Sequence, residues 1–204
     1  MPPAPKFRRR SDARPDEILD AALAVFASQG FDAARMDDIA GNAGVSKGAL
    51  YLYFESKEAV LKGLIEREVA PVAAHLRALA EQCGADPAAA LRLIVKTAVQ
   101  LTQAPAFAAT PRVVLAVAAR FPEIGRYYRE HVVDIGLGAI EAMIAKGVAR
   151  GAFRAIDAAA AARLVMGPIL LNAVHVHILG GAPDDDAAAR AEALIDIVFR
   201  GIAA

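Results

Sequence analysis

The fold is decided by residues 36–54, which read MDDIAGNAGVSKGALYLYF. This stretch predicts two short helices that meet at Gly44, because glycine adopts the backbone angles of a tight turn that other residues avoid. Ser46 is suited to cap the second helix through its hydroxyl. Ile39 and Leu50 are the candidates to pack the two helices against each other. The spacing therefore predicts a helix-turn-helix.

The opposite face of the second helix carries small and polar residues. Small side chains at the start of this helix allow a close approach to DNA, and a capped helix N-terminus favours a phosphate. In a helix-turn-helix the second helix lies in the major groove. Each residue also has a purely structural interpretation, as a surface lysine, a half-buried tyrosine or an ordinary helix position. The residues of this face are Lys47, Gly48, Ala49, Tyr51 and Tyr53.

The full motif reads Ile39-Ala40-x-x-Ala43-Gly44-Val45-Ser46-Lys47-Gly48-x-Leu50-Tyr51-x-Tyr53-Phe54-x-Ser56-Lys57-Glu58. A second pattern, Phe26-Ala27-x-x-Gly30-Phe31, precedes it. In this region, over residues 12–62, the chain resembles the DNA-binding domain of the TetR (tetracycline-repressor) family of bacterial transcriptional regulators. That resemblance implies DNA contacts by Arg35, Ser46, Lys47, Gly48, Ala49, Tyr51, Tyr53 and Lys57.

Arg35 departs from the family pattern, which usually has Thr or Ser near this position to cap the helix and touch a phosphate. An arginine side chain has no acceptor with which to cap a helix. As a cation it can still reach a phosphate, so Arg35 remains among the expected contacts.

The rest of the chain is also helical in pattern, with Pro or Gly at the boundaries and no alternating strand run. The sequence predicts an all-α fold of about nine helices. The expected domains are a basic arm (1–14), a helix-turn-helix head (15–60) and a ligand-binding and dimerisation domain (61–204). The predicted helices run from Pro15 to Gly30, over 36–43 and 46–54, from Ser56 with a kink at Pro71, and over 88–103, 106–119, 122–149, 157–179 and 184–202.

The charge of the whole chain is balanced, with 23 Lys and Arg against 23 Asp and Glu. By itself this argues against a nucleic-acid binder. The first residues are nonetheless basic, with Lys6, Arg8, Arg9, Arg10 and Arg14 against the single acid Asp12. They form either a solvated terminus or an arm that lies along the DNA backbone or in a narrow minor groove. With such an arm, nonspecific DNA binding is expected to be modest and salt-sensitive.

The resemblance also implies a ligand pocket among the middle helices. A ligand that releases DNA must bind the DNA-incompetent conformation more tightly than the competent one. The candidates to contact it are polar residues on apolar helices, although each can instead be a satisfied core group or a surface residue. They are Gln100, Thr102, Arg112, Tyr128, His131, Asn172 and His175. The apolar helices suggest an apolar or amphipathic effector.

The last two helices are expected to pair with those of a second copy, because 163–182 is too apolar to stay uncovered. The expected interface residues are Leu164, Leu171, Ala191, Leu194, Ile195 and Val198. A two-fold dimer would present two recognition helices to half-sites about one turn of DNA apart. The sequence therefore predicts a near-palindromic operator.

The uncharged stretch 164–183 is about as long as a membrane-spanning helix. Its Asn172, His175 and Gly167-Pro168 pair favour a buried helix of a soluble protein instead, so no membrane partner is expected. No apolar segment follows the basic N-terminus, which argues against a signal peptide and favours the cytoplasm.

No cofactor, metal or catalytic site is expected. The single Cys83 excludes an intramolecular disulfide and a cysteine-based zinc site. His175 and His177 lie two residues apart and so point away from each other on a helix. No nucleophile–base pattern occurs, which disfavours an enzyme.

The function expected is therefore a ligand-responsive, sequence-specific transcriptional regulator, a repressor that binds DNA as a dimer. The alternatives are an activator or an effector-independent DNA-binding protein. A regulatory domain without a cavity would favour the effector-independent alternative.

Overall fold

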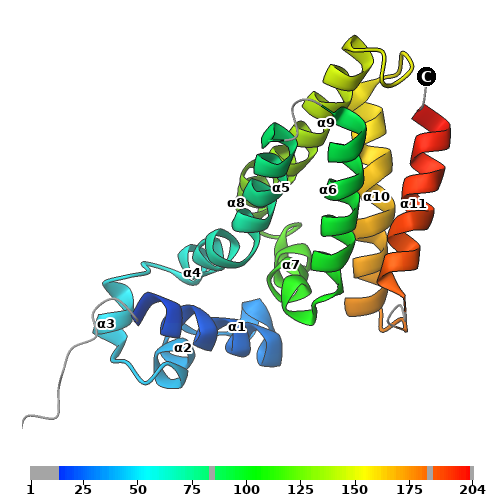
Figure 1. Cartoon of the computed structure of the whole chain (residues 1–204). Helices are drawn as coiled ribbons and strands as arrows, with labels where there is room; N and C mark the ends of the chain where they lie inside the picture. The colour runs from blue at the N-terminus through cyan, green and yellow to red at the C-terminus, as the bar shows by residue number, and fades with distance from the viewer. Residues whose placement is uncertain (1–13, 83–85, 183–185, 203–204) are drawn as a thin grey trace, which may run out of the picture. The chain divides into compact units, whose positions relative to one another are not determined.

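The computed structural model describes residues 14–82, 86–182 and 186–202 of the chain, and among these it is helical without strands. The chain divides into two compact units at Leu64 and Ile65, a few residues beyond the expected boundary at 60 and 61 (Figure 1). The all-α prediction is confirmed. Of the basic arm expected at 1–14, only Arg14 lies within the described residues.

The first unit contains the predicted helix-turn-helix. Its fully buried side chains include Ile18, Ile39, Leu50 and Leu61, so one apolar core joins all four helices. The rings of Phe26 and Phe31 add to this core with centroids 5.1 Å apart. The helices of the unit are α1 (Arg14–Ala33), α2 (Met36–Asn42), α3 (Lys47–Tyr51) and α4 (Lys57–Leu64).

Gly30 breaks α1 at the residue where the sequence predicts the first helix to end. Its φ of 79° and ψ of 159° lie in a region of backbone angles that is essentially restricted to glycine. The chain therefore leaves the helix in an extended direction before Phe31 returns to the core.

The turn of the motif forms at Gly44, whose φ is +65°. The backbone N–H of Val45 donates to the carbonyl of Ala40 at 3.0 Å, which closes the corner. The helix that follows is shorter than predicted. The N–H groups of Tyr53 and Phe54 both donate to the Leu50 carbonyl at 3.0 Å, which ends α3 at Tyr51 instead of Phe54.

The second unit contains two π-helical turns that the sequence does not predict. The first ends at Val69, two residues before Pro71, which lacks an N–H and whose ring clashes with a regular α-helix. The expected kink at Pro71 therefore takes the form of a π turn. The second interrupts the helix expected over 122–149, and its sequence offers no comparable signal. The elements are η1 (Ile65–Val69), α5 (Ala70–Gln82), α6 (Pro87–Gln103), α7 (Pro105–Val117), α8 (Pro122–Tyr128), η2 (Arg129–Val133), α9 (Asp134–Ala149), α10 (Ala158–His177) and α11 (Ala187–Ile202).

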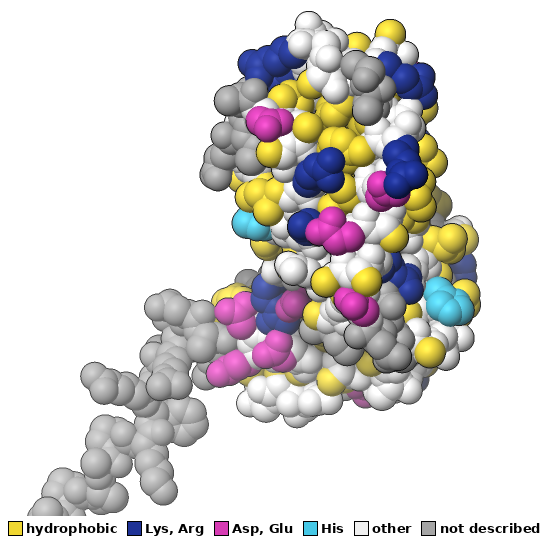
Figure 2. All heavy atoms as spheres, turned by 45° about the vertical axis from the view of Figure 1, so that its right-hand side comes forward, with side chains coloured by type: hydrophobic (Ala, Val, Ile, Leu, Met, Phe, Trp, Pro, Cys, Tyr) yellow, Lys and Arg dark blue, Asp and Glu magenta, His cyan; other side chains and the backbone are white. Residues whose placement is uncertain are grey.

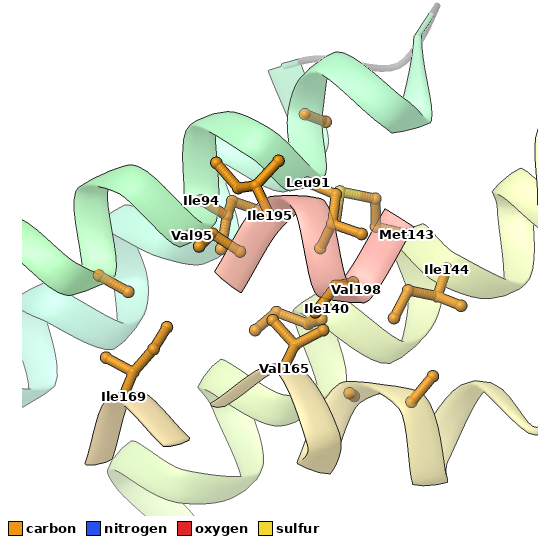
Figure 3. Packing of buried hydrophobic residues seen from close by; sticks show 14 of the residues in the cluster. Leu91, Ile94, Val95, Ile140, Met143, Ile144, Val165, Ile169, Ile195 and Val198 are labelled. Atoms are coloured by element: carbon orange, nitrogen blue, oxygen red, sulfur yellow. The ribbon is translucent and has the colours of Figure 1, made fainter. Parts of the chain in front are cut away.

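The core of the second unit lies where α6, α9, α10 and α11 meet (Figure 3). Leu91 and Ile94 of α6 and Ile140 of α9 are completely buried there. Each such side chain stabilises the fold by about 1.5–3 kcal/mol relative to an exposed one. The packing of α11 on α6 leaves only the opposite side of α11 open.

This packing corrects the expected dimer interface. Ala191, Ile195 and Val198 are buried in the core of their own chain, and Leu194 packs against that core. The stripe that the sequence assigned to a partner is thus the inward face of α11. Of the predicted interface residues, only Leu164 and Leu171 are exposed, at 65% and 68%.

One helix in the described part of the chain, α10, is long and apolar enough to cross a membrane by length and composition. Only 28% of its most apolar window is buried within the chain. The helix was expected to be buried, so its open apolar side needs an explanation.

The positive φ of Gly44 predicts a clear difference between two nearby glycines. Replacing Gly44 with Ala should lower the free energy of unfolding by about 1–2 kcal/mol, because an L side chain is strained at this angle. Gly41→Ala is the matched control, since Gly41 is helical and has open space around its Cβ position. It should be neutral or slightly stabilising. Urea denaturation followed by circular dichroism measures both, and equal effects would contradict the strain at Gly44.

Candidate nucleic-acid interface and ligand pocket

The start of α3 has the geometry expected of a recognition helix. Ser46 accepts a hydrogen bond through Oγ from the backbone N–H of Ala49 at 3.2 Å, which confirms the predicted cap. Gly48 is exposed, and nothing lies within 4 Å of the position where its Cβ would stand. The helix start is therefore uncovered within its unit.

Beyond the start of α3, the exposed face is aromatic and apolar. Tyr51 and Tyr53 are both exposed, as a role outside the core requires. Between them Leu52 is 84% exposed, the most open of the large apolar residues described. Leu52 was not among the DNA contacts predicted from the sequence. Its position between Tyr51 and Tyr53, which were both predicted to face outward, could have indicated its exposure.

Lys47 is not a free cation. Its ammonium group lies 2.7 Å from one carboxylate oxygen of Asp37 and donates a hydrogen bond to the other at 3.0 Å. This hydrogen bond and the negative charge of Asp37 raise the pKa of Lys47. Both side chains are exposed, so a phosphate could replace the carboxylate at little cost. A DNA contact by Lys47 therefore stays a prediction, and it would require the Asp37 carboxylate to give way.

Lys57 has a structural role that corrects the expected phosphate contact. Its ammonium group donates to the backbone carbonyls of Phe31 at 2.7 Å and Asp32 at 3.0 Å, and it lies 4.7 Å from the centre of the Phe31 ring. The carbonyls at the end of a helix have no intrahelical partner and favour a cation. Lys57 thus holds the end of α1 against α4.

Arg35 stands at the N-cap of α2 without a side-chain cap, as its chemistry requires. Instead, the carboxylate of Asp38 accepts a hydrogen bond from the Arg35 backbone N–H at 3.0 Å. The Arg35 guanidinium is exposed and takes no part in this bond. A phosphate contact by Arg35 therefore stays a prediction.

A mostly apolar pocket of about 110 Å³ lies in the second unit. It is bounded by helices that are far apart in the sequence, from η1 to α10. Among the seven polar residues expected to contact a ligand, only Tyr128 lines it. The lining residues are Val69, Val72, Ala73, Leu76, Phe107, Tyr128, Val132, Val133, Gly136, Leu137, Met166 and Leu170.

The other six expected ligand residues lie elsewhere. Thr102 is buried, and its hydroxyl donates to the carbonyls of Ala98 and Val99, which makes it a satisfied core group. His131 stacks on Tyr127 with ring centres 3.9 Å apart. The remaining four do not line the pocket: Asn172 is half-buried, and the side chains of Gln100, Arg112 and His175 are exposed. Polar residues on apolar helices were therefore poor predictors of the pocket lining, because the wall of the pocket is itself apolar.

Both π turns border the pocket. Val69 comes from η1, while Val132 and Val133 come from η2. The Tyr127 hydroxyl, on α8 just before η2, donates to Glu66 of η1 at 2.5 Å and so ties η1 to α8. Burial and this hydrogen bond raise the pKa of Tyr127 to about 12, so the phenol stays protonated at neutral pH. Such turns occur often at functional sites.

In the described residues, no cluster of three His, Cys, Asp or Glu could hold a metal ion. The two histidines considered above point to different surroundings, since His177 contacts the Thr102 carbonyl at 2.8 Å whereas His175 is exposed.

Family models match both units and define a class of protein, the helix-turn-helix transcriptional regulators. Residues 18–64 match bacterial regulatory proteins of the tetR family. Residues 89–200, more than half of the chain, match the C-terminal domain of AefR-like transcriptional repressors. The chain belongs to the TetR family of DNA-binding transcriptional regulators.

Individual relatives share mainly the head. The HTH-type regulator YfiR of Bacillus subtilis is 41% identical over 59 residues, which is 29% of this chain and 29% of that protein. The activator FasR of Mycolicibacterium smegmatis is 45% identical over 58 residues, 28% of this chain and 26% of that protein. The matches thus span less than a third of these relatives' length.

Solved structures match the whole fold at low identity. A TetR-family regulator from Mesorhizobium loti superposes with a TM-score of 0.79 at 21% identity, covering 97% of this chain and 100% of its own. FadR of Bacillus subtilis in complex with stearoyl-CoA has a TM-score of 0.68 at 20% identity, covering 91% and 98%. These likenesses establish the fold alone.

The Lys47–Asp37 pair predicts that Asp37 lowers the affinity of the protein for DNA. Asp37→Asn removes a negative charge beside the recognition helix and frees Lys47, so affinity for DNA should rise several-fold at low salt. Fluorescence anisotropy with labelled DNA measures this change. Glu141→Gln, an exposed carboxylate of α9, is the control with the same change in charge. A similar gain in both variants would show a net-charge effect and contradict a local one.

Proposed function

We propose that this protein is a repressor that binds a near-palindromic operator as a homodimer and is released by a small apolar or amphipathic effector. The observation that carries the proposal is the uncovered, Ser46-capped start of α3 in a chain that also holds an apolar pocket. The AefR-like match of the second unit favours repression, whereas similarity to the activator FasR is confined to the head.

The DNA contacts proposed are Arg35, Ser46, Lys47, Gly48, Ala49, Tyr51 and Tyr53. Phosphate contacts from Arg35, Lys47 and the tyrosines would position the head, whereas the small residues would bring the backbone close to base edges. Leu52, exposed beside them, is suited to an apolar contact such as a thymine methyl group. Lys57 is left out because its donors already serve the end of α1.

The open side of α10 and α11 is the proposed dimer interface. Leu164 and Leu171 lie seven residues apart on α10, with Gly167 between them on the same exposed face. On α11 the corresponding stripe contains Ala193 and Ile197, four residues apart. Figure 2, in which α11 comes forward, shows hydrophobic side chains gathered on this unit among scattered charges. A second copy would cover this surface, which also accounts for the open side of α10.

The pocket favours an effector over the effector-independent alternative. Structural neighbours include FadR with stearoyl-CoA and SmeT with triclosan. The apolar wall here suits a molecule that is largely apolar. An effector would act by binding more tightly to the conformation that cannot hold the operator.

Within this proposal the protein works in the cytoplasm, where the operator is, and has neither a membrane partner nor a cofactor. It is proposed to have no enzymatic activity, in keeping with the regulatory role of its family.

The DNA-binding surface is tested by the double variant Lys47→Ala and Tyr51→Ala. Binding to DNA from either side of the gene should fall by about tenfold or more, because two contacts are lost. Fluorescence anisotropy against unrelated competitor DNA measures specific binding. Both residues are exposed, so the fold should be unaffected. Lys146→Ala of α9 is the control, and undiminished specific binding in the double variant would overturn the assignment of α3.

The interface is tested by Ile197→Arg, alone and with Leu171→Arg. A charge placed in an apolar contact lacks a partner, so each variant should shift the protein towards a monomer. Light scattering coupled to size-exclusion chromatography gives the mass. Ile197 is 68% exposed in the single chain, and Leu115→Arg on α7 is the control because Leu115 is 57% exposed. The proposal fails if the mass of the Ile197 variants stays that of the parent.

A further inference from the structure

The residues that line the pocket include one polar side chain and no charged one. Eleven of its twelve lining residues carry apolar side chains or none, and the twelfth is Tyr128. A charged group brought into such surroundings would lose its hydration without gaining a partner, which is strongly unfavourable. The wall therefore selects against an ionised group inside the pocket.

Tyr128 has an unused hydrogen-bonding group. It is half-buried, and its hydroxyl forms no hydrogen bond within the part of the chain that the structure describes. Its neighbour Tyr127 differs, because that hydroxyl donates to Glu66. Burial raises the pKa of Tyr128 to about 12, so the phenol is protonated at neutral pH and able to donate.

The cations on the two π turns are already paired. Arg129 of η2 lies 2.9 Å from Glu130 and 2.6 Å from Asp134. Arg67 of η1 lies 2.7 Å from Glu68. Neither arginine lines the pocket. An anionic ligand would thus have to break an existing ion pair to be neutralised at this site.

The size of the pocket limits what can be enclosed. A volume of about 110 Å³ is somewhat smaller than the ~150 Å³ cavity that admits benzene in another protein. A single ring or a short branched chain therefore approaches the limit unless the wall moves. Larger ligands would extend past Leu170, which lines the pocket yet is partly exposed.

We propose that the pocket binds a neutral, largely apolar molecule whose single hydrogen-bond acceptor, a carbonyl or ether oxygen, accepts from the Tyr128 hydroxyl. This inference rests on the proposed function, because it takes the pocket to be the effector site. It narrows the effector from apolar or amphipathic compounds in general to uncharged ones with an acceptor.

Three probes of matched size test the inference: cumene, acetophenone and benzoate, which have the same number of non-hydrogen atoms. Cumene lacks an acceptor, acetophenone has a carbonyl, and benzoate is an anion at neutral pH. Isothermal titration calorimetry with the full chain and no DNA measures each affinity. Acetophenone should bind more tightly than benzoate. Tyr128→Phe should weaken acetophenone by about five- to tenfold and leave cumene unchanged, since only one neutral hydrogen bond is lost.

Two further variants keep the result interpretable. Tyr127→Phe removes a hydroxyl outside the lining and should leave the affinities of both neutral probes unchanged. Leu170→Trp adds bulk at a partly exposed wall position and should weaken both neutral probes, which places them in this pocket.

The proposal is overturned if Tyr128→Phe weakens cumene and acetophenone equally, if benzoate binds most tightly, or if neither neutral probe binds the parent protein. The proposal is also overturned if Leu170→Trp leaves the affinities of the neutral probes unchanged, because the probes would then bind outside this pocket. The calorimetric titrations are carried out without DNA. A failure of operator binding would therefore leave this result standing, and a failure here would leave the DNA-binding head untouched.

Discussion

The packing of α11 on α6 is the constraint on which the second unit depends. Ile195 and Val198 fill the space beside Leu91 and Ile94, and the side of α11 that carries them is closed as a result. Because one side of α11 is used in this way, the apolar residues on its other side, such as Ile197, are left open. The same core fixes α9 and α10 and so positions two walls of the pocket.

The head shows how a chain without net charge can be built for DNA. Two of its lysines are engaged within the unit, Lys47 with Asp37 and Lys57 with the carbonyls that end α1. Beside the paired Lys47, the exposed residues of α3 and its end are small, aromatic or apolar. Such a surface favours recognition by close fit over attraction by charge.

Both π turns contribute to the wall of the pocket. The first begins at Ile65, directly after the last residue of α4, and contributes Val69 to the pocket wall. The second supplies Val132 and Val133. The Tyr127–Glu66 hydrogen bond joins η1 to α8, the helix that runs into the second turn. Such π turns are rare and lie frequently at functional sites.

The sequence by itself determined the all-α fold, the helix-turn-helix with its Gly44 turn and Ser46 cap, and the exposed face of α3. These features depend on local rules of spacing, capping and backbone angles, which a short stretch of chain expresses completely. The helix boundaries were predicted less accurately than the helices themselves. For example, α3 ends earlier than predicted because the N–H groups of Tyr53 and Phe54 both donate to the carbonyl of Leu50.

Only the tertiary structure decided which apolar stripe of α11 faces the core, that Lys57 holds α1, and that Tyr128 alone of seven polar candidates lines the pocket. An apolar side chain has the same identity in a core, a pocket wall or an interface. Its role depends on which helix lies opposite, and that contact joins residues far apart in the sequence.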